Sequence, residues 1–286
     1  MRLISFVADH QPQYGLCVDR GIVALGKRLP YGDLRALLAA DGIQAAARAA
    51  AGSAADFDLD AVRFLPAIPN PGKIVCIGLN YEDHRLETAR PKMNYPTVFT
   101  RFADTQVGHR EALVKPRHSD KMDYEGELAV IIGKPGRDIP AATAHEHVAG
   151  YACYNDASIR DFQGHTSQFT PGKNFPATGA FGPFLVTADE VGPVGAQRLQ
   201  TRLNGRVMQD ARLGDMIFPV ERLIAYVSSW TALSPGDVIV TGTPGGVGMK
   251  REPPVYMKDG DEITVEIDGV GMLSNRVVAE PPAARG

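Results

Sequence analysis

The arrangement of apolar and polar residues along the chain predicts a β-rich protein with few helices. Short apolar runs bounded by turn residues recur throughout, among them KIVCIGLN at 73–80, GELAVIIG at 126–133 and EITVEIDGVGMLSNRVV at 262–278. A run that is apolar throughout is typical of a strand buried on both faces. The pair Asp268-Gly269 predicts a hairpin turn within the last segment. The chain shows no internal repeat and no regular alternation of strands with helices.

Two segments have helical character, and a proline-rich connector separates the first of them from the rest. Residues 33–52 are rich in alanine, which favours helices. Residues 217–232 carry apolar residues at helical spacing, with one face formed by Val220, Leu223, Ile224 and Val227. Between them, Pro69 and Pro71 exclude a helix. We therefore expect a small N-terminal domain over residues 1–70 and a catalytic domain over 71–286.

Composition and charge exclude several classes of function. Hydrophobic residues make up 44% of the 286 positions, which supports a large core, and the net charge of -3 offers no basic surface for nucleic acid or an anionic membrane. No apolar run approaches the roughly 18 residues of a membrane span. Asp9 and His10 interrupt the start before a signal-peptide core forms. The three cysteines form no CxxC, so a reducing, cytoplasmic location is expected.

Two glutamates at the start of the apolar run 126–133 are the first candidates for chemistry. Glu125 and Glu127 are two residues apart, so in a strand they face the same side. Burying both charges is costly unless a cation compensates them, and a hard divalent ion with oxygen ligands does so. Asp156, after the next apolar segment, is a candidate third ligand. Spacing alone equally fits two glutamates that pair with surface lysines at a strand edge.

Five segments, in order, resemble the fumarylacetoacetate hydrolase family. They are GLNYEDHRLE (78–87), DYEGELAVIIG (123–133), GYACYNDASIRDFQ (150–163), LSPGDVIVTGTPGGVG (233–248) and DGDEITVEIDGVGMLSNRVV (259–278). The resemblance covers roughly residues 73–280. It implies an α+β, β-rich fold of the family's mixed β-roll type, with a small N-terminal α/β domain. It also implies that Glu125, Glu127 and Asp156 hold Mg²⁺ or Mn²⁺, that the substrate is a small keto acid, and that the chain forms a homodimer.

The family's NYxxHxxE segment matches a possible acid–base pair. His84 and Glu87 are three residues apart, so on a helix they are neighbours, and a carboxylate beside an imidazole favours a base that works near neutral pH. The resemblance gives this pair the role of a His–Glu dyad on a mobile lid. Lys173, in the long polar stretch 160–183, matches a family lysine that stabilises an oxyanion or delivers a proton. A surface ion pair and a solvated lysine are the alternatives.

Further residues are expected at the substrate. Arg160 and Gln163 resemble family positions that contact substrate, and Arg101 stands where many relatives carry lysine. The amides of the glycine-rich turn are candidates to receive a substrate carboxylate, with Thr241, Gly242 and Thr243 as its first residues. The turn has no nucleotide-binding spacing. The sequence HEH at 145–147 looks metal-like, but we interpret it as surface, and the polar loop with His165, Ser167 and Gln168 suits a polar substrate tail.

Together these residues predict an enzyme, a divalent-metal-dependent hydrolase that cleaves a C–C bond in a 2,4-dioxo acid through an enolate held by the metal. In this scheme His84 deprotonates a water, which attacks the 4-carbonyl. The alternatives use the same enolate for a different outcome: an oxaloacetate-type decarboxylase, a 2-keto-3-deoxy acid dehydratase or a dienoate isomerase. A non-enzymatic domain of the same fold is a third hypothesis. Neither nucleic acid nor membrane is expected as a partner.

Overall fold

The largest element of the fold is a twelve-stranded mixed β-sheet, seen in the computed structural model, which describes residues 1–282. Its strands are β1 (Arg2–Ala8), β2 (Gln11–Val18), β3 (Gly21–Ala24), β4 (Phe57–Asp58), β5 (Arg63–Phe64), β6 (Ile74–Gly78), β7 (Thr97–Arg101), β8 (Gln106–Val107), β11 (Gly126–Ile132), β12 (Val148–Asp156), β14 (Gly179–Thr187) and β17 (Val238–Val240). The order across the sheet is β4-β3-β2-β1-β14-β12-β11-β17-β6-β7, with β5 beside β1 and β8 beside β14. β11 is buried at all seven positions, as its apolar run predicts.

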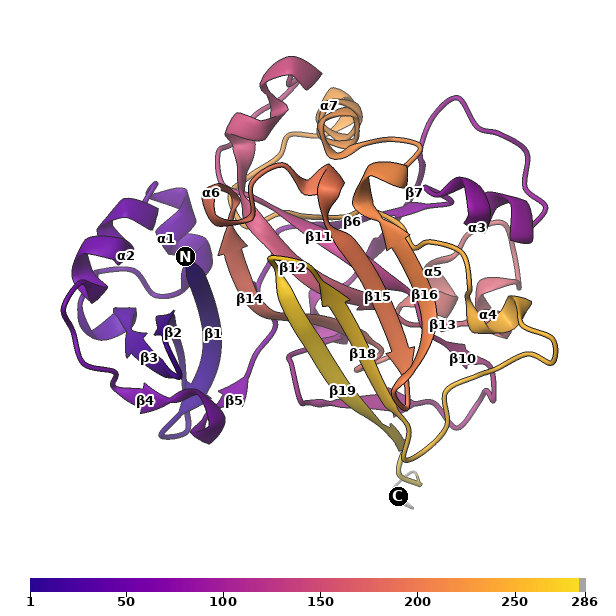
Figure 1. Cartoon of the computed structure of the whole chain (residues 1–286), viewed down its shortest axis with the longest axis horizontal. Helices are drawn as coiled ribbons and strands as arrows, with labels where there is room; N and C mark the ends of the chain where they lie inside the picture. Colours follow the sequence, from indigo (N-terminus) through magenta and orange to yellow (C-terminus); the bar gives the residue numbers. More distant parts are fainter. Residues whose placement is uncertain (283–286) are drawn as a thin grey trace.

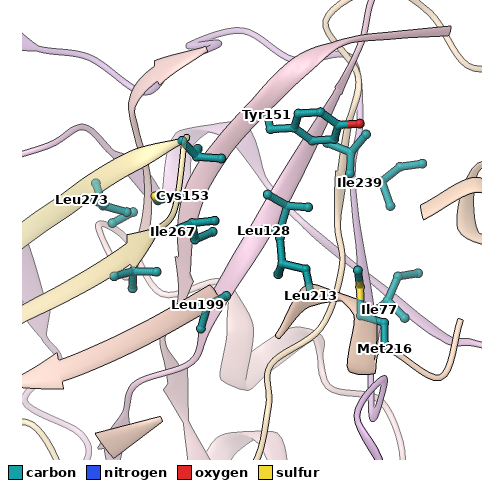
Figure 2. Packing of buried hydrophobic residues seen from close by; sticks show 14 of the residues in the cluster. Ile77, Leu128, Tyr151, Cys153, Leu199, Leu213, Met216, Ile239, Ile267 and Leu273 are labelled. Atoms are coloured by element: carbon teal, nitrogen blue, oxygen red, sulfur yellow. The ribbon is translucent and has the colours of Figure 1, made fainter. Parts of the chain in front are cut away.

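A second, five-stranded sheet packs against the large one and encloses the main core. Its strands are β9 (Ala112–Lys115), β15 (Arg198–Leu203), β16 (Arg206–Arg212), β18 (Glu262–Ile267) and β19 (Gly271–Ala279), in the order β16-β15-β18-β19-β9, and a two-stranded sheet pairs β10 (Met122–Asp123) with β13 (Ser158–Ile159). Leu128 and Cys153 of the large sheet belong to the same buried cluster as Leu199, Ile267 and Leu273 of the second sheet (Figure 2). Both sheets bury apolar faces in this core, so the predicted β-rich α+β fold is confirmed.

The helices are few and short. They are α1 (Leu34–Ala39), α2 (Ile43–Ala50), α3 (Glu82–Glu87), α4 (Arg160–Gln163), α5 (Thr170–Lys173), α6 (Ala188–Val191) and α7 (Val220–Trp230). The predicted helical face of α7 is buried, with Val220, Leu223, Ile224 and Val227 all against the core. Asp33 caps α1 by accepting a hydrogen bond from the Ala36 amide at 2.7 Å. Within residues 1–282 no helix has the length and apolar character to cross a membrane.

The N-terminal strands extend the large sheet rather than forming a sheet of their own. β1 pairs antiparallel with β14, where Leu3 faces Leu185. These two leucines also belong to one buried cluster that joins α1 and α2 to the large sheet. In Figure 1 the N-terminal elements lie at one end of the molecule, and α3, α4 and α5 lie toward the other. The expected boundary near residue 70 therefore coincides with a chain segment between paired strands, and it stays a prediction.

The stretch 160–183 is more ordered than its polar sequence predicts. It forms the one-turn helices α4 and α5, and β14 already begins at Gly179. The two helices pack closely, since a Cβ at Gly172 would lie 2.4 Å from the backbone nitrogen of Gln163. β14 is held by its pairing with β12, β1 and β8. Tertiary contacts, which periodicity does not reveal, thus order this stretch.

Two smaller predictions agree with the fold. The turn between β18 and β19 carries Gly269 at a φ of 74°, a conformation that favours glycine. The HEH sequence lies in a 3₁₀ segment (Ala141–His147), where His145 and Glu146 are exposed. His147 Nδ1 is 2.9 Å from the Lys134 carbonyl oxygen. These side chains lie outside the group of metal-ligand candidates found within residues 1–282.

Candidate metal and acid–base site

Three buried carboxylates meet where β11 begins and β12 ends. Glu125 immediately precedes β11, Glu127 is its second residue, and Asp156 closes β12. The two strands are paired there, and the Asp156 amide donates to the Glu125 carbonyl oxygen at 2.9 Å. Each of the three side chains offers an oxygen within 4.8 Å of the others. The pairing of two antiparallel strands therefore joins Asp156 to the glutamates, which lie some thirty residues earlier in the chain.

Three buried cations surround the carboxylates and pair with two of them. Lys173 Nζ lies 2.6 Å from both Glu125 Oε2 and Asp156 Oδ2. Arg101 Nη1 lies 2.6 Å from Asp156 Oδ1, and Arg160 Nη1 lies 2.7 Å from Glu125 Oε1. Glu125 and Asp156 are thus compensated by the protein itself.

Glu127 is treated differently by its surroundings. Within residues 1–282 it has no cationic partner within 4 Å, and its carboxylate accepts one backbone hydrogen bond, from the Gly242 amide at 2.5 Å. Burial and the neighbouring charges of Asp156 and Glu125 raise the pKa of Glu127 well above its ordinary value. Burial acts the same way on Glu125, but the charges of Lys173 and Arg160 outweigh it and lower the pKa of Glu125. Glu127 is therefore the one carboxyl of the three that pairs with no side-chain cation in the described part of the chain.

A divalent cation fits this arrangement. The donors are carboxylate oxygens, which Mg²⁺ and Mn²⁺ accept, and the cation would compensate the charge of Glu127. Glu125, Glu127 and Asp156 would hold the ion. Burial would lower the pKa of Lys173, but the charges of Asp156 and Glu125 raise it above its ordinary value, so this side chain is an ammonium group beside the carboxylates. The geometry supports a divalent metal without distinguishing Mg²⁺ from Mn²⁺.

The predicted pair on α3 forms a hydrogen-bonded dyad. His84 Nδ1 lies 2.7 Å from Glu87 Oε1. The other oxygen of Glu87 accepts from the Gly246 amide at 3.0 Å, so the same carboxylate ties α3 to the glycine-rich turn. Burial alone would raise the pKa of Glu87, but the bonds from His84 and Gly246 lower it. The ionised carboxylate of Glu87 accepts a hydrogen bond from the N–H at Nδ1 of His84, so Nε2 is the ring nitrogen that is able to take up a proton.

His84 of the dyad and two of the three carboxylates, Glu125 and Glu127, line one cavity of about 630 Å³. Of the residues singled out in the sequence, those lining it are His84, Glu125, Glu127, Arg160, Gln163, Ser167, Lys173 and Thr243. Arg101 and Asp156 are fully enclosed behind it, in contact with each other. Arg160 has one nitrogen, Nη2, that is buried without a hydrogen-bond partner in the structure. An unpaired guanidinium donor in a cavity wall is a contact point for a ligand oxygen.

The start of the glycine-rich turn uses its amides within the protein. The Thr241 amide donates to the Leu128 carbonyl at 3.0 Å, and the Gly242 amide donates to Glu127. Neither residue lines the cavity. Gly242 has a φ of 100°, which explains the glycine. Both amides are thus bonded within the protein, and Thr243 is the member of the group that lines the cavity. Contact between this turn and a substrate carboxylate stays a prediction.

Sequence reasoning missed Asp123, a fully buried carboxylate near the site. Its oxygens accept from Arg160 Nε at 2.8 Å and from the amides of Gly248 and Met249 at 2.8 and 2.9 Å. Asp123 thereby orients Arg160 and fixes the end of the glycine-rich turn. The available signal was its spacing, two residues before Glu125. Two cavity-lining cations, Arg90 and Lys250, were also missed.

Comparisons with known proteins agree with this geometry. A family model described as fumarylacetoacetate (FAA) hydrolase C-terminal matches residues 73–278. Oxaloacetate tautomerase FAHD2A, mitochondrial, of Homo sapiens is 39% identical, covering 97% of this chain and 92% of the relative. The structure of a fumarylacetoacetate hydrolase from Exiguobacterium antarcticum is 34% identical with a TM-score of 0.82, covering 98% of this chain and all of that one.

A second solved structure bears on the metal. Maleylpyruvate hydrolase from Sphingobium sp. SYK-6, in complex with manganese(II) and pyruvate, is 28% identical with a TM-score of 0.83 and covers 98% of this chain and all of that one.

The comparisons also correct the expected cytoplasmic location. Relatives from Homo sapiens and Rattus norvegicus carry the word mitochondrial in their names. Cysteine spacing does not tell one reducing compartment from another.

Proposed function

We propose that this chain, which belongs to the fumarylacetoacetate hydrolase family, interconverts the enol and keto forms of a 2-oxo acid. The enzymes of this family act on keto acids. The observation that carries this proposal is the cavity that His84, held by Glu87, shares with the buried carboxylates Glu125 and Glu127. A base and a cationic, metal-suited pocket in one cavity are what proton transfer beside a carbonyl requires. The oxaloacetate tautomerases among the relatives support it.

The chain's own residues would bind and orient the substrate. A divalent ion held by Glu125, Glu127 and Asp156 would act as a Lewis acid toward the oxygens of the substrate's 2-oxo acid group. The unpaired Nη2 of Arg160 donates to one of these substrate oxygens. Glu125 and Asp123 hold the rest of the Arg160 guanidinium, so its direction is fixed before substrate arrives.

The proton moves between His84 and the substrate carbon C3. His84 Nε2 takes a proton from C3, and the electron pair of that C–H bond moves through C2 to the carbonyl oxygen. The ammonium of Lys173 and the guanidinium of Arg160 offset the negative charge that develops there. Glu87 stabilises the imidazolium that forms. The imidazolium then passes this proton through water to the oxygen, which completes the enol and restores neutral His84, and the reverse sequence returns the keto form.

Hydrolysis of a C–C bond is the second candidate, favoured by the same dyad. In the apo cavity the His84 Nε2 atom can activate a water as well as take a proton from carbon. The likeness to maleylpyruvate hydrolase supports this outcome. Decarboxylation and isomerisation pass through the same type of 2-oxo acid enolate and differ in the bond that breaks to form it. The enolate is common to all these outcomes, so the substrate decides among them.

Replacement of His84 tests the proposal. Wild-type protein with Mn²⁺ is expected to accelerate the enol-to-keto conversion of oxaloacetate, followed by ultraviolet absorbance. His84→Asn is expected to lower kcat by about 10²–10⁴-fold, the usual contribution of a general base. Mn²⁺ binding, measured by calorimetry, should be retained because His84 is not one of the carboxylate ligands.

His118→Asn is the matched control, since His118 is exposed and outside the cavity. It should keep the wild-type rate. Full activity in His84→Asn would contradict the proposed base. Product analysis with an acylpyruvate decides the second candidate: release of pyruvate and a carboxylic acid at a rate that exceeds the tautomerisation rate would make hydrolysis the principal activity.

A further inference from the structure

Two of the cations that line the cavity are not used by the protein. Arg90 follows α3, and Lys250 ends the 3₁₀ segment Gly248–Lys250 after the glycine-rich turn. Within residues 1–282 neither side chain has an acidic partner within 4 Å or a hydrogen bond to another group. Both residues are exposed, whereas Glu125 and Glu127 are buried, so the two cations stand at the mouth of the cavity and the carboxylates at its base.

Neighbouring cations on the same two segments are engaged within the protein. Arg85 of α3 pairs with Glu82 at 2.6 Å, and Arg251 donates to the Gly246 carbonyl oxygen. Arg160 and Lys173, deeper in the cavity, pair with the buried carboxylates. Among the lysines and arginines that line the cavity, Arg90 and Lys250 are thus the two without an acidic partner in the described residues.

Hydrogen bonds hold the backbone at or next to both positions, so the points from which the two side chains extend are fixed. The Arg90 amide donates to the Arg85 carbonyl at 3.1 Å, and Arg85 Nη1 donates back to the Arg90 carbonyl at 2.6 Å. Lys250 directly follows the amides of Gly248 and Met249, which Asp123 holds.

The two segments are also joined to each other. Glu87, three residues before Arg90, accepts from the Gly246 amide, four residues before Lys250. One hydrogen bond, which the carboxylate of Glu87 accepts, thus holds α3 against the glycine-rich turn, and both cations lie at the rim of one cavity.

We propose that Arg90 and Lys250 form a distal anion subsite that binds a second carboxylate of the substrate. The enzyme's substrate class is then a 2-oxo dicarboxylic acid, with its 2-oxo acid end at the buried carboxylates and its other carboxylate at the rim. This inference rests on the proposed function, because it places the 2-oxo end at the candidate metal site.

A carboxylate suits this subsite better than a phosphate. Phosphate sites in proteins are commonly built from backbone amides. Here three amides of the glycine-rich turn are already taken, with Gly242 donating to Glu127, Gly246 to Glu87, and Gly248 to Asp123. Two side-chain cations remain, one for each oxygen of a carboxylate.

The cavity wall between the buried carboxylates and the two cations at the rim suits a hydrocarbon chain. Phe99 and Phe169 line the cavity and contact each other edge to face, with ring centroids 5.7 Å apart, and Met93 lies along the same cavity. Apolar groups at this position would contact the carbons between the two ends of a dicarboxylic acid.

Binding measurements with matched ligand pairs test the subsite. Calorimetry in saturating Mn²⁺ would compare oxaloacetate, 2-oxoglutarate and 2-oxoadipate with 2-oxobutanoate, 2-oxopentanoate and 2-oxohexanoate, which have the same chain lengths but no second carboxylate. Wild-type protein is expected to prefer the dicarboxylate at one length or more by about tenfold, an ordinary value for two partly exposed charge contacts. Arg90→Met and Lys250→Met should each reduce this preference by about threefold, and the double variant should abolish it, with monocarboxylate binding unchanged.

Lys92→Met is the control, because Lys92 lies in the same lid segment, carries the same charge and does not line the cavity. It should keep the preference. If wild-type protein binds oxalate and monocarboxylates but prefers no dicarboxylate, or if the double variant keeps the preference, the subsite is overturned and the proposed function stands. If neither oxalate nor any 2-oxo acid binds in the presence of Mn²⁺, both proposals fall.

Discussion

At the scale of single residues, Glu127 best shows how this site differs from a set of ordinary ion pairs. Lys173, Arg101 and Arg160 neutralise its neighbours, yet its own buried carboxylate receives one amide hydrogen bond. A buried carboxylate without a cationic partner lowers the free energy of unfolding. The arrangement is stable when a cation is supplied from outside, which connects stability to metal binding.

Replacement of Glu127 should therefore abolish the stabilisation of the folded protein by metal binding. Mn²⁺ is expected to raise the melting temperature of the wild-type protein, since saturation at about 100 times Kd stabilises by about 2.7 kcal/mol. Glu127→Gln should melt at or above the metal-free wild-type temperature and show no Mn²⁺-dependent increase, as measured by differential scanning calorimetry. Glu146→Gln, at an exposed position, is the control. An undiminished Mn²⁺ shift in Glu127→Gln would contradict Glu127 as a ligand.

His109 gives a second residue-scale prediction, on stability against pH. Its buried ring meets Phe64 edge to face, and its Nδ1 accepts from the Ser274 amide at 3.0 Å. Burial, and then the charge of Arg110, lower the pKa of His109 from 6.5 to about 4. Below pH 6.5 the His109 ring is protonated in the unfolded chain, whereas in the folded chain it stays neutral down to about pH 4. Stability from this group is thus complete above pH 6.5 and is lost as the pH falls toward 4, by about 3 kcal/mol at most.

Urea unfolding at pH 7, 5.5 and 4.5 would measure this loss. His109→Gln should lose less stability than wild type across the range, because glutamine does not titrate. His118→Gln, at an exposed position, should follow the wild-type curve. Parallel curves for His109→Gln and wild type would show that His109 titrates alike in the folded and unfolded chains.

At the scale of elements, α3 is the segment on which the proposed chemistry depends. A six-residue helix is too short to be stable by itself. Asn80, just before it, accepts from the Phe218 amide and donates to the Thr241 carbonyl, and Glu87 at its end reaches Gly246. The helix is thus held at both ends by distant parts of the chain, and its position depends on few bonds.

Glu87→Gln should loosen α3 as well as weaken catalysis. We expect faster amide hydrogen exchange in residues 82–90 and a kcat lower by about 10–100-fold, since the glutamine bonds His84 and Gly246 without charge. Exchange mass spectrometry and tautomerase kinetics are the measurements. Glu82→Gln, which loses an exposed ion pair on the same helix, should change neither much. A rate loss with unchanged exchange would separate the chemical role of Glu87 from its role as a tether.

At the scale of the whole molecule, the N-terminal strands and the site-bearing strands share one sheet. β1 lies at the junction, and Leu3 is fully buried in a cluster that includes residues of α1, β12 and β17. A junction of this kind predicts that the two parts unfold together. The homodimer that the family resemblance implies stays a prediction, to be checked by the protein's mass in solution.

Leu3→Ala should lower the free energy of unfolding of the entire chain by about 2–5 kcal/mol, the usual cost of such a cavity. We expect one cooperative transition, seen equally by the fluorescence of Trp230 and by circular dichroism. Val18→Ala, at a 39% exposed position on β2, should cost much less. Two separate transitions would show that residues 1–70 unfold as an independent domain.

The sequence by itself determined which residues are candidates and what chemistry they carry. The apolar runs predicted β11 and the buried face of α7, and the ordered motifs indicated the family, the three carboxylates and the dyad, because these depend on local spacing. Only the tertiary structure decided which charges are neutralised, which amides are taken, and which cations remain at the rim. Asp156, Lys173 and Gly246 come from distant segments. Strand pairing brings Asp156 to the glutamates, whereas ion pairing brings Lys173 to them and a hydrogen bond joins Gly246 to α3, and no sequence period reveals these contacts.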